Sequence, residues 1–243
     1  MDNKSIVGRQ AELDGIRNGL SSNGSAKGFL FIGEAGIGKT TMLEESWRTL
    51  SSTPNPIIWI APNLSSAKDE LAAASSLARG IDTSSTDLRA GLSTFARAFG
   101  QKAFEIQRES TKAEPSSDST IGAQLAEQWL EHFTEALPEL RASGSPGPLV
   151  VVAVDDVSKL HAKVVDWLAE EFLPKWKEAG IAERTRYIFA TEKKPDGQKL
   201  EWIKAACDGR VIEMKLRALR SAECAELARS MGHPSPDGEN LRT

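Results

Sequence analysis

A glycine-rich stretch that ends in a lysine and two threonines has the residue types with the clearest chemistry in this chain. Residues 33–41 read GEAGIGKTT and fit the pattern G-x-x-x-x-G-K-[ST], known as Walker A. In this pattern the backbone N–H groups point at phosphate oxygens, Lys39 reaches the β- and γ-phosphates, and the Thr40 hydroxyl binds Mg²⁺. The predicted phosphate-binding residues are Gly33, Glu34, Ala35, Gly36, Ile37, Gly38, Lys39, Thr40 and Thr41.

Two adjacent aspartates are the second candidate site. Asp155 and Asp156 follow the apolar run 149–154, and a parallel sheet presents the carboxyl ends of its strands to the ligand. Asp155 is predicted to hold Mg²⁺ through a water, as a Walker B acid does, and Asp156 to orient or deprotonate the attacking water. The alternatives are a capping or loop acid for Asp155 and a solvated loop acid for Asp156.

Apolar runs that could form the strands around these motifs alternate with segments of helical spacing, which is typical of βα units around a parallel sheet. Most runs lack polar alternation, so we expect strands buried on both faces. The expected fold is an α/β three-layer sandwich with a five-stranded parallel sheet formed by residues 28–32, 57–60, 149–154, 187–190 and 211–216. Because the run 57–60 lies between the two motifs, we expect an additional strand to separate their strands.

Apolar stripes at helical spacing predict the helices that cover this sheet. These stripes begin at Met42, Leu88, Leu125 and Val164. Ser158 is the expected N-cap of the last helix. Stretches rich in Ser, Pro, Gly or Thr predict surface connections at 51–56, 110–120 and 143–148. The tail from Gly232 has no apolar period, so we expect the chain to stop in a loop at a fragment boundary.

The charge balance argues against one class of function and leaves another open. The 243 residues carry 30 Lys and Arg against 34 Asp and Glu, and this net charge of −4 argues against a general nucleic-acid coat protein. Residues 184–220 differ from the rest, with 10 basic and 5 acidic side chains. We interpret this segment as a solvated face, with contact to DNA or an acidic partner as the alternative.

The cysteines and the hydropathy bear on where the protein works. Cys207 and Cys224 are two cysteines without a disulfide framework, and both are predicted to be buried thiols. No apolar run approaches the roughly 18 to 20 residues of a membrane span, and the first residues lead into no signal peptide. We therefore expect a cytoplasmic protein with no membrane partner.

Other nucleotide-binding families fit less well. A GTPase needs an N-K-x-D guanine motif, which the nearest stretch, residues 192–196 (EKKPD), does not provide. An ABC transporter ATPase needs an L-S-G-G-Q-like signature, which the sequence lacks. RecA-type and nucleoside-kinase functions remain as minor alternatives.

Five features in order resemble one family. Residues 6–13 (IVGRQAEL) are similar to the V-G-R-x-x-E-L opening of STAND-type ATPases and their AAA+ relatives, about 25 residues before the phosphate loop. The likeness continues through that loop, the acidic strand and a strand that ends at Thr191. Residues 216–223 (LRALRSAE) resemble the L-x-x-L-x-x-x-E entry into a helical lid. Residues 61–145 match no motif.

This resemblance implies a P-loop nucleotide-binding domain over residues 1–216, followed by the start of a lid over 217–243 that is expected to be truncated. The backbone around Ile6 and Val7, with Gly8, would contact adenine. Arg9 would approach the nucleotide or secure the opening turn, with a solvated residue at a helix start as the alternative. Thr191 would be the catalytic sensor of the γ-phosphate, with a polar strand-end residue as the alternative.

The sequence also departs from the family pattern. Many relatives carry an arginine directly after the sensor threonine, whereas Glu192 stands here and the next cations are Lys193 and Lys194. Arg210 is at the position where AAA+ proteins often carry an arginine finger that acts on a neighbouring subunit. Without that arginine, the family pattern does not predict how the γ-phosphate is sensed or how fast ATP is hydrolysed.

The expected function is a slow, Mg²⁺-dependent ATPase that acts as a molecular switch, with Lys39, Asp156 and Thr191 as its catalytic residues and Thr40 and Asp155 as metal ligands. ATP or ADP would control self-assembly or the binding of a protein partner. One alternative is a scaffold that keeps ADP or ATP as a structural cofactor. Another is an AAA+ machine that binds DNA through residues 184–220.

Overall fold

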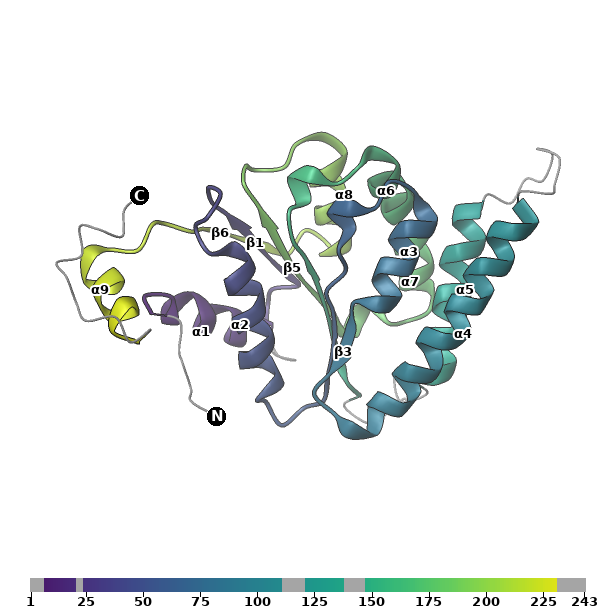
Figure 1. Ribbon diagram of the computed structural model, residues 1–243, viewed down its shortest axis with the longest axis horizontal. Coiled ribbons are helices and arrows are strands. Elements are labelled where there is room, and N and C mark those ends of the chain that lie inside the picture. The colour runs from purple at the N-terminus through teal and green to yellow at the C-terminus, as the bar shows by residue number, and fades with distance from the viewer. Residues whose placement is uncertain (1–6, 21–23, 111–120, 138–146, 231–243) are drawn as a thin grey trace.

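The computed structural model describes residues 7–20, 24–110, 121–137 and 147–230. Several expectations lie outside these residues: the adenine contact at Ile6, the connection 111–120, most of the connection 143–148, and the tail from Gly232. Figure 1 shows the described residues as a sheet with helices on both sides and a separate terminal helix, α9 (Ser221–Ser230).

The sheet has six strands in the order β3-β2-β4-β5-β1-β6, and every pairing except that of β2 with β3 is parallel. The strands are β1 (Gly28–Ile32), β2 (Ile57–Ile60), β3 (Ile81–Thr83), β4 (Leu149–Val154), β5 (Thr185–Thr191) and β6 (Val211–Lys215). All five predicted strands are present. The expected strand count was wrong by one, because β3 adds an antiparallel edge strand beside β2.

One strand separates the strand of the phosphate loop from the acidic strand, as expected. This strand is β5, however, and not the strand near residue 58, which lies beyond β4 as β2. All seven residues of β5 are buried, since β1 and β4 flank it and helices cover both faces. The carboxyl ends of β1, β5 and β4 therefore meet at one edge of the sheet.

Alternate residues of the strands divide the core into two clusters. On one face, α1 (Gln10–Gly19) and α2 (Lys39–Ser51) pack with Phe29 and Ile188. On the other face, Leu30 and Phe189 pack against the remaining helices of the core (Figure 1). Those helices are α3 (Glu70–Arg79), α4 (Thr86–Ser110), α5 (Ile121–Ala136), α6 (Ala162–Trp167), α7 (Leu173–Glu178) and α8 (Gly197–Ala206). The three-layer α/β fold is thus as predicted.

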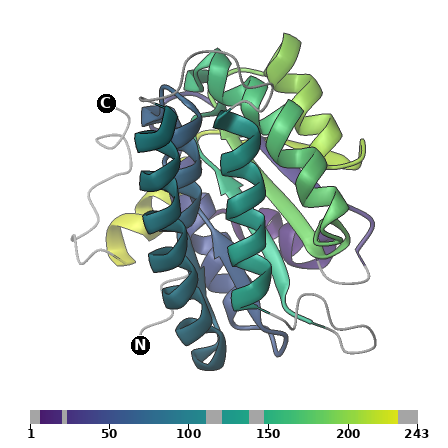
Figure 2. The same ribbon diagram turned by 90° about the vertical axis from the view of Figure 1, so that its right-hand side faces the viewer.

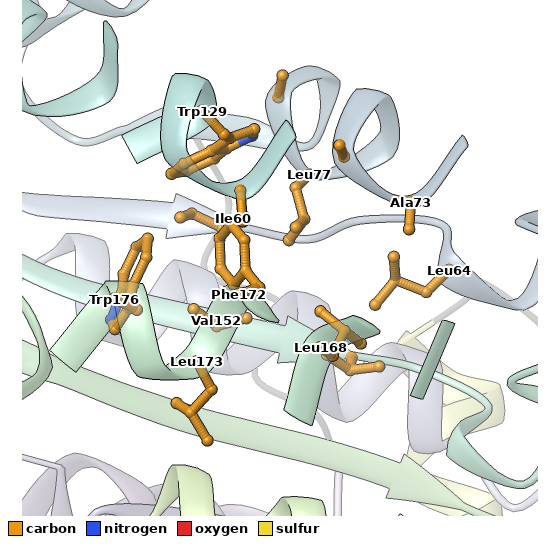
Figure 3. Packing of buried hydrophobic residues seen from close by; sticks show 14 of the residues in the cluster. Ile60, Leu64, Ala73, Leu77, Trp129, Val152, Leu168, Phe172, Leu173 and Trp176 are labelled. Atoms are coloured by element: carbon orange, nitrogen blue, oxygen red, sulfur yellow. The ribbon is translucent and has the colours of Figure 1, made fainter. Parts of the chain in front are cut away.

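The described part of residues 61–145, which matched no motif, forms α3, β3 and the long helices α4 and α5. Figure 2 shows α4 and α5 side by side in front of the sheet. Both pack on α3, and α5 also packs on the segment before α7. Trp129 of α5 is fully buried, with its ring centroid 5.3 Å from that of Phe172 and 5.7 Å from that of Trp176. In Figure 3 Trp129 and Phe172 lie above Val152 of the sheet, and Trp176 lies to its left.

Three local expectations were wrong. Ser158 does not cap a helix: it lies in a 3-10 turn (Val157–Lys159), and α6 starts after His161. The reason is that Leu160 is buried and extended, which delays the helix. The stripe from Val164 is not one α-helix, since a π-helical turn (Leu168–Phe172) separates α6 from α7. Cys224 is half-buried, whereas Cys207 is fully buried as predicted.

Candidate nucleotide site

The predicted phosphate loop connects β1 to α2 at the carboxyl edge of the sheet. Gly38 has φ 90°, a left-handed conformation that favours glycine, and it stands directly before Lys39, the first residue of α2. Lys39 is buried, and its Nζ donates to the carbonyls of Gly33 and Glu34, each at 2.8 Å. The lysine is therefore folded into the loop, and a bound phosphate would have to draw it from these carbonyls.

Thr40 and Asp155 meet across the gap between the two motifs. The Thr40 hydroxyl donates to Asp155 Oδ2 at 2.6 Å, and the backbone N–H of Asp156 donates to Asp155 Oδ1 at 2.8 Å. A hydroxyl and a carboxylate are the hard oxygen ligands that Mg²⁺ accepts when phosphates and waters complete its octahedron. The two residues therefore fit a magnesium ion held together with nucleotide phosphates.

A pocket of about 350 Å³ lies over the phosphate loop. It is lined by Ala35, Gly36, Gly38, Lys39, Thr40, Thr41, Asp155, Asp156, Lys159 and Glu192. Eight of these ten were predicted site residues, so both motifs contribute to one pocket. The prediction missed Lys159 altogether and noted Glu192 only as a departure from the family. The sequence did contain an indication of this role, because Lys159 is a cation three residues after the acidic pair.

Asp156 is fixed by its backbone and by Lys159. Its φ of 51° and ψ of 43° are left-handed, an uncommon conformation for a residue other than glycine. Lys159 Nζ donates to Asp156 Oδ2 at 2.9 Å. This hydrogen bond and the charge of Asp156 raise the pKa of Lys159, and the charges of Glu192 and Asp155 add to the effect. The site therefore places one ammonium among three carboxylates.

Thr191 is buried at the end of β5, opposite Ile32 of β1. Its carbonyl accepts from the N–H of Gly33 at 3.2 Å, so it lies beside the start of the phosphate loop. Its hydroxyl, however, donates to the carbonyl of Lys193 at 2.8 Å, within its own loop. Glu192, and not Thr191, lines the phosphate pocket. Sensing of the γ-phosphate by Thr191 remains a prediction that would require its hydroxyl to release Lys193.

Arg9 joins the opening turn to the phosphate loop. Its guanidinium is 3% exposed, which contradicts the alternative of a solvated residue. It donates to the carboxylate of Glu12 and to the carbonyl of Ile37, each at 3.3 Å, and also to the carbonyl of Arg217. These contacts secure the opening turn, which also contains the buried Val7. Val7, Gly8 and Arg9 are not among the described residues that line the phosphate pocket, so their contact with nucleotide remains a prediction.

The start of the expected lid contacts the same turn. Glu223 of α9 accepts from Arg217 Nη1 at 2.8 Å, from Arg217 Nη2 at 2.6 Å and from the N–H of Arg220 at 2.6 Å. These bonds lower the pKa of Glu223 to about 2. Glu223 also packs on Gly8, where an added β-carbon would lie 2.8 Å from its Cδ. One glutamate therefore connects α9, the end of the sheet and the opening turn.

Several basic residues of the segment 184–220 lie beside carboxylates. Lys194 pairs with Glu213 at 2.6 Å, and Lys204 pairs with Glu201 at 2.9 Å. Arg210 lies 3.8 Å from a carboxylate oxygen of Asp208, just before β6 and thus at the amino edge of the sheet. Because the phosphate loop is at the opposite edge, Arg210 cannot serve the site of its own chain, and a role at a neighbour's site remains a prediction.

A second, larger groove of about 720 Å³ borders the pocket. The two share Thr40, Asp155 and Asp156. The groove extends toward β2, where Trp47 and Trp59 line it with their ring centroids 5.5 Å apart. The aspartates can therefore be reached from the β2 side, whereas Arg9 and α9 lie on the β6 side.

Comparisons with known proteins identify a family and a similar fold. The family model described as an AAA ATPase domain matches residues 5–173. The structure of the Orc1 protein of Aeropyrum pernix in complex with DNA is similar, with a TM-score of 0.52 and 14% identity. The similarity covers 94% of this chain and 50% of that one, so this chain spans about half its length. A search of curated proteins finds no match. No helix among the described residues is long and apolar enough to cross a membrane.

Proposed function

The chain belongs to the AAA ATPase domain family of P-loop ATPases, and from this premise we propose that it is a slow nucleotide-dependent switch of the STAND type. It binds ATP with Mg²⁺, hydrolyses it, and differs between the ATP and ADP states in its affinity for a protein partner or for further copies of itself. A switch needs slow turnover, because its active state must outlast the encounter with its partner.

The hydrogen bond of 2.6 Å between Thr40 and Asp155 supports the proposal most directly. It brings together the two residues expected to hold the metal, although 115 positions separate them in the chain. Mg²⁺ bound by their oxygens would neutralise charge on the β- and γ-phosphates. A glycine-rich turn with an incidental lysine would not explain why an acidic strand end meets the first turn of α2.

Asp156 and Lys159 would carry the chemical step together. A water oxygen bonds to the γ-phosphorus, the bond from that phosphorus to the bridging oxygen breaks, and Asp156 accepts the water proton. Asp156 can do this only when Lys159 releases it. The γ-phosphate offers Lys159 a stronger anionic partner, so ATP would draw the ammonium away and free the carboxylate. Lys159 would then supply the positive charge that Glu192 does not.

The contacts of Glu223 suggest how the nucleotide state could reach a partner. Arg9 binds the carbonyl of Ile37 inside the phosphate loop, and it binds the carbonyl of Arg217, whose side chain holds Glu223. A shift of the loop on nucleotide binding would therefore act on α9 through two residues. The partner surface would lie on α9 or on the residues that follow it.

A structural scaffold that keeps ADP or ATP is the second candidate. The replacement of the expected arginine by Glu192 favours it, because a carboxylate beside the γ-phosphate opposes the charge that develops during transfer. Action on DNA is a weaker third candidate. It relies on the fold shared with Orc1, a protein whose structure contains DNA, whereas several basic residues of 184–220 already have acidic partners.

The test combines nucleotide identification with turnover. Purified protein is denatured, the released nucleotide is identified by chromatography, and ATP hydrolysis is measured with and without Mg²⁺. We expect Lys39→Ala to abolish nucleotide binding, and Asp156→Asn to preserve binding while slowing turnover about tenfold or more. Lys163→Ala, which changes an exposed lysine of α6, is the control. Bound ADP without any Mg²⁺-dependent turnover would favour the scaffold, and unchanged ATP affinity in Lys39→Ala would refute the site.

A further inference from the structure

A cavity of about 290 Å³ lies at the edge of the sheet opposite the nucleotide site. The first residues of β2 and β4, Ile57 and Leu149, line its floor together with Arg186, the second residue of β5. Arg17, in the last turn of α1, and Arg184, which precedes β5, complete the basic part of its wall. The family motifs and the proposed ATPase make no use of this cavity.

Arg186 is a buried cation, and the part of the chain that the structure describes places no carboxylate next to its guanidinium. Only 7% of the residue is exposed, and no carboxylate oxygen among the described residues lies within 4.0 Å of its guanidinium. Nη1 donates to the carbonyls of Glu183 and Thr185, each at 3.0 Å, whereas Nε is buried without a hydrogen-bond partner. Burying a guanidinium in this way is costly unless an anion accompanies it.

The charges around Arg186 do not supply that anion. Burial lowers the pKa of Arg186, as does the positive charge of Arg210, and only Glu183 acts in the opposite direction. The side chain of Glu183 is 86% exposed, with a carboxylate oxygen 3.9 Å from Lys27 Nζ. Among the described residues that line the cavity, three are arginines and one is a glutamate, which faces largely into solvent.

We propose that this cavity binds a phosphate-type dianion, either inorganic phosphate or the phosphate group of a small phosphomonoester, through Arg186, Arg17 and Arg184. The guanidinium of Arg186 has Nε uncommitted, and a guanidinium edge presents parallel N–H groups that match two oxygens of a phosphate. Arg17 reaches the cavity from α1 and Arg186 from β5, so the anion would bridge helix and sheet. The volume exceeds that of one phosphate, which leaves room for a small organic group.

Titration calorimetry with inorganic phosphate and with glycerol 3-phosphate tests the proposal, in the presence and absence of saturating Mg²⁺ and ADP. Because the phosphate loop also binds phosphate, binding there would be lost once ADP is present. We expect saturable binding that persists with ADP. Tighter binding of glycerol 3-phosphate than of inorganic phosphate would identify the ester as the ligand class, and the reverse would identify the free ion. No binding of either anion overturns the proposal.

Variants then locate the binding. Arg186→Met should weaken phosphate binding at least about tenfold, because it removes a charge-assisted contact. Arg17→Ser, an exposed change that avoids disturbing the core, should weaken it several-fold even if Arg186→Met does not fold. Arg89→Ser, at an exposed arginine of α4, should leave the affinity unchanged. Unchanged affinity in Arg17→Ser and in any folded Arg186→Met, or binding only of duplex DNA, would exclude the small-anion site.

Discussion

Lys159 is the residue at which the structure adds most to the chemistry. It donates to Asp156, lines the phosphate pocket, and has the charges of Asp155 and Glu192 nearby. We expect Lys159→Ala to bind ATP within a few-fold of the wild-type affinity and to hydrolyse it about tenfold more slowly or worse, because a cation at the transferring phosphoryl group is lost. Steady-state turnover and nucleotide titration separate the two effects.

The control for this change is Lys163→Ala, since Lys163 is exposed four residues further on and outside the pocket. Equal turnover in both variants would contradict a role for Lys159 in hydrolysis. If Lys159→Ala is slow, comparison with Lys159→Arg separates two causes, because an arginine keeps the positive charge and restores part of the rate if that charge is what the reaction uses.

Some residues of the candidate site belong to short sequence motifs and could be predicted, whereas others are placed by the bends of loops and could not. Thr40 and Asp155 were predicted because each belongs to a short pattern directly after a buried strand, and strand ends at one sheet edge must converge. Lys159 was missed because its place depends on the left-handed turn at Asp156, which no local pattern indicates. The hydrogen bond from the Thr191 hydroxyl to the carbonyl of Lys193 could not be predicted from the sequence either, because it depends on how the loop after β5 bends.

At the scale of elements, the carboxylate of Glu223 contributes to the attachment of α9. The pKa of Glu223 is about 2, below its ordinary value of 4.5, so its contribution to holding α9 is fully present above about pH 4.5 and is lost as the pH falls through about 2. The amide N–H of Arg220 donates to Glu223. We expect its NMR resonance to titrate with a midpoint near pH 2 and to lose this titration in Glu223→Gln. A midpoint near 4.5 would contradict the contact.

Glu226→Gln is the matched control for that titration, because Glu226 is exposed on the same helix. It should leave the Arg220 resonance and its midpoint unchanged. Raised salt should shift the Arg220 midpoint upward in the wild type, since screening weakens the attraction between Arg217 and Glu223.

Helix α5 is held to the fold by its aromatic residues. The side chain of Trp129 is 0% exposed and contacts rings from α4, the π-helical turn and α7. We expect Trp129→Ala to lower the free energy of unfolding by about 3–5 kcal/mol, through lost burial and a cavity. Phe104→Ala on α4 is the control: Phe104 is 66% exposed, so the change should stay within about 0.5 kcal/mol. Urea denaturation measures both.

Strands with long runs of apolar residues were predicted from the sequence, whereas the three-residue strand β3 was not. The runs of β4 and β5 are buried throughout or nearly so and cannot be mistaken for loops. β3 has three residues, only one of them buried, and owes its place to pairing with β2 and to the hydrogen bond from Thr83 Oγ1 to the carbonyl of Ile57. Such tertiary contacts leave no periodic trace in the sequence.

At the scale of the whole molecule, the candidate nucleotide site and the proposed phosphate cavity lie at opposite edges of the sheet. The candidate nucleotide site lies at the carboxyl ends of β1 and β4, and the proposed phosphate cavity lies at the amino ends of β2, β4 and β5. β5 spans both, from Arg186 to Thr191, and it is buried throughout. The sequence predicted that one strand separates the strands of the two motifs, but it did not identify that strand as β5. It did not predict the cavity, because the arginines of the cavity come from α1 and from both sides of a strand start.

The outer strand β6 has a further consequence. Among the described residues it pairs only with β1, and Ile212 and Glu213 on it are exposed. An open strand edge invites another chain to extend the sheet, and charged side chains on that edge oppose such growth. We therefore expect Glu213 and Lys215, both exposed on β6, to oppose the pairing of this edge with another chain. Valine at both positions would be compatible with the fold of a single molecule and would endanger its solubility at high concentration.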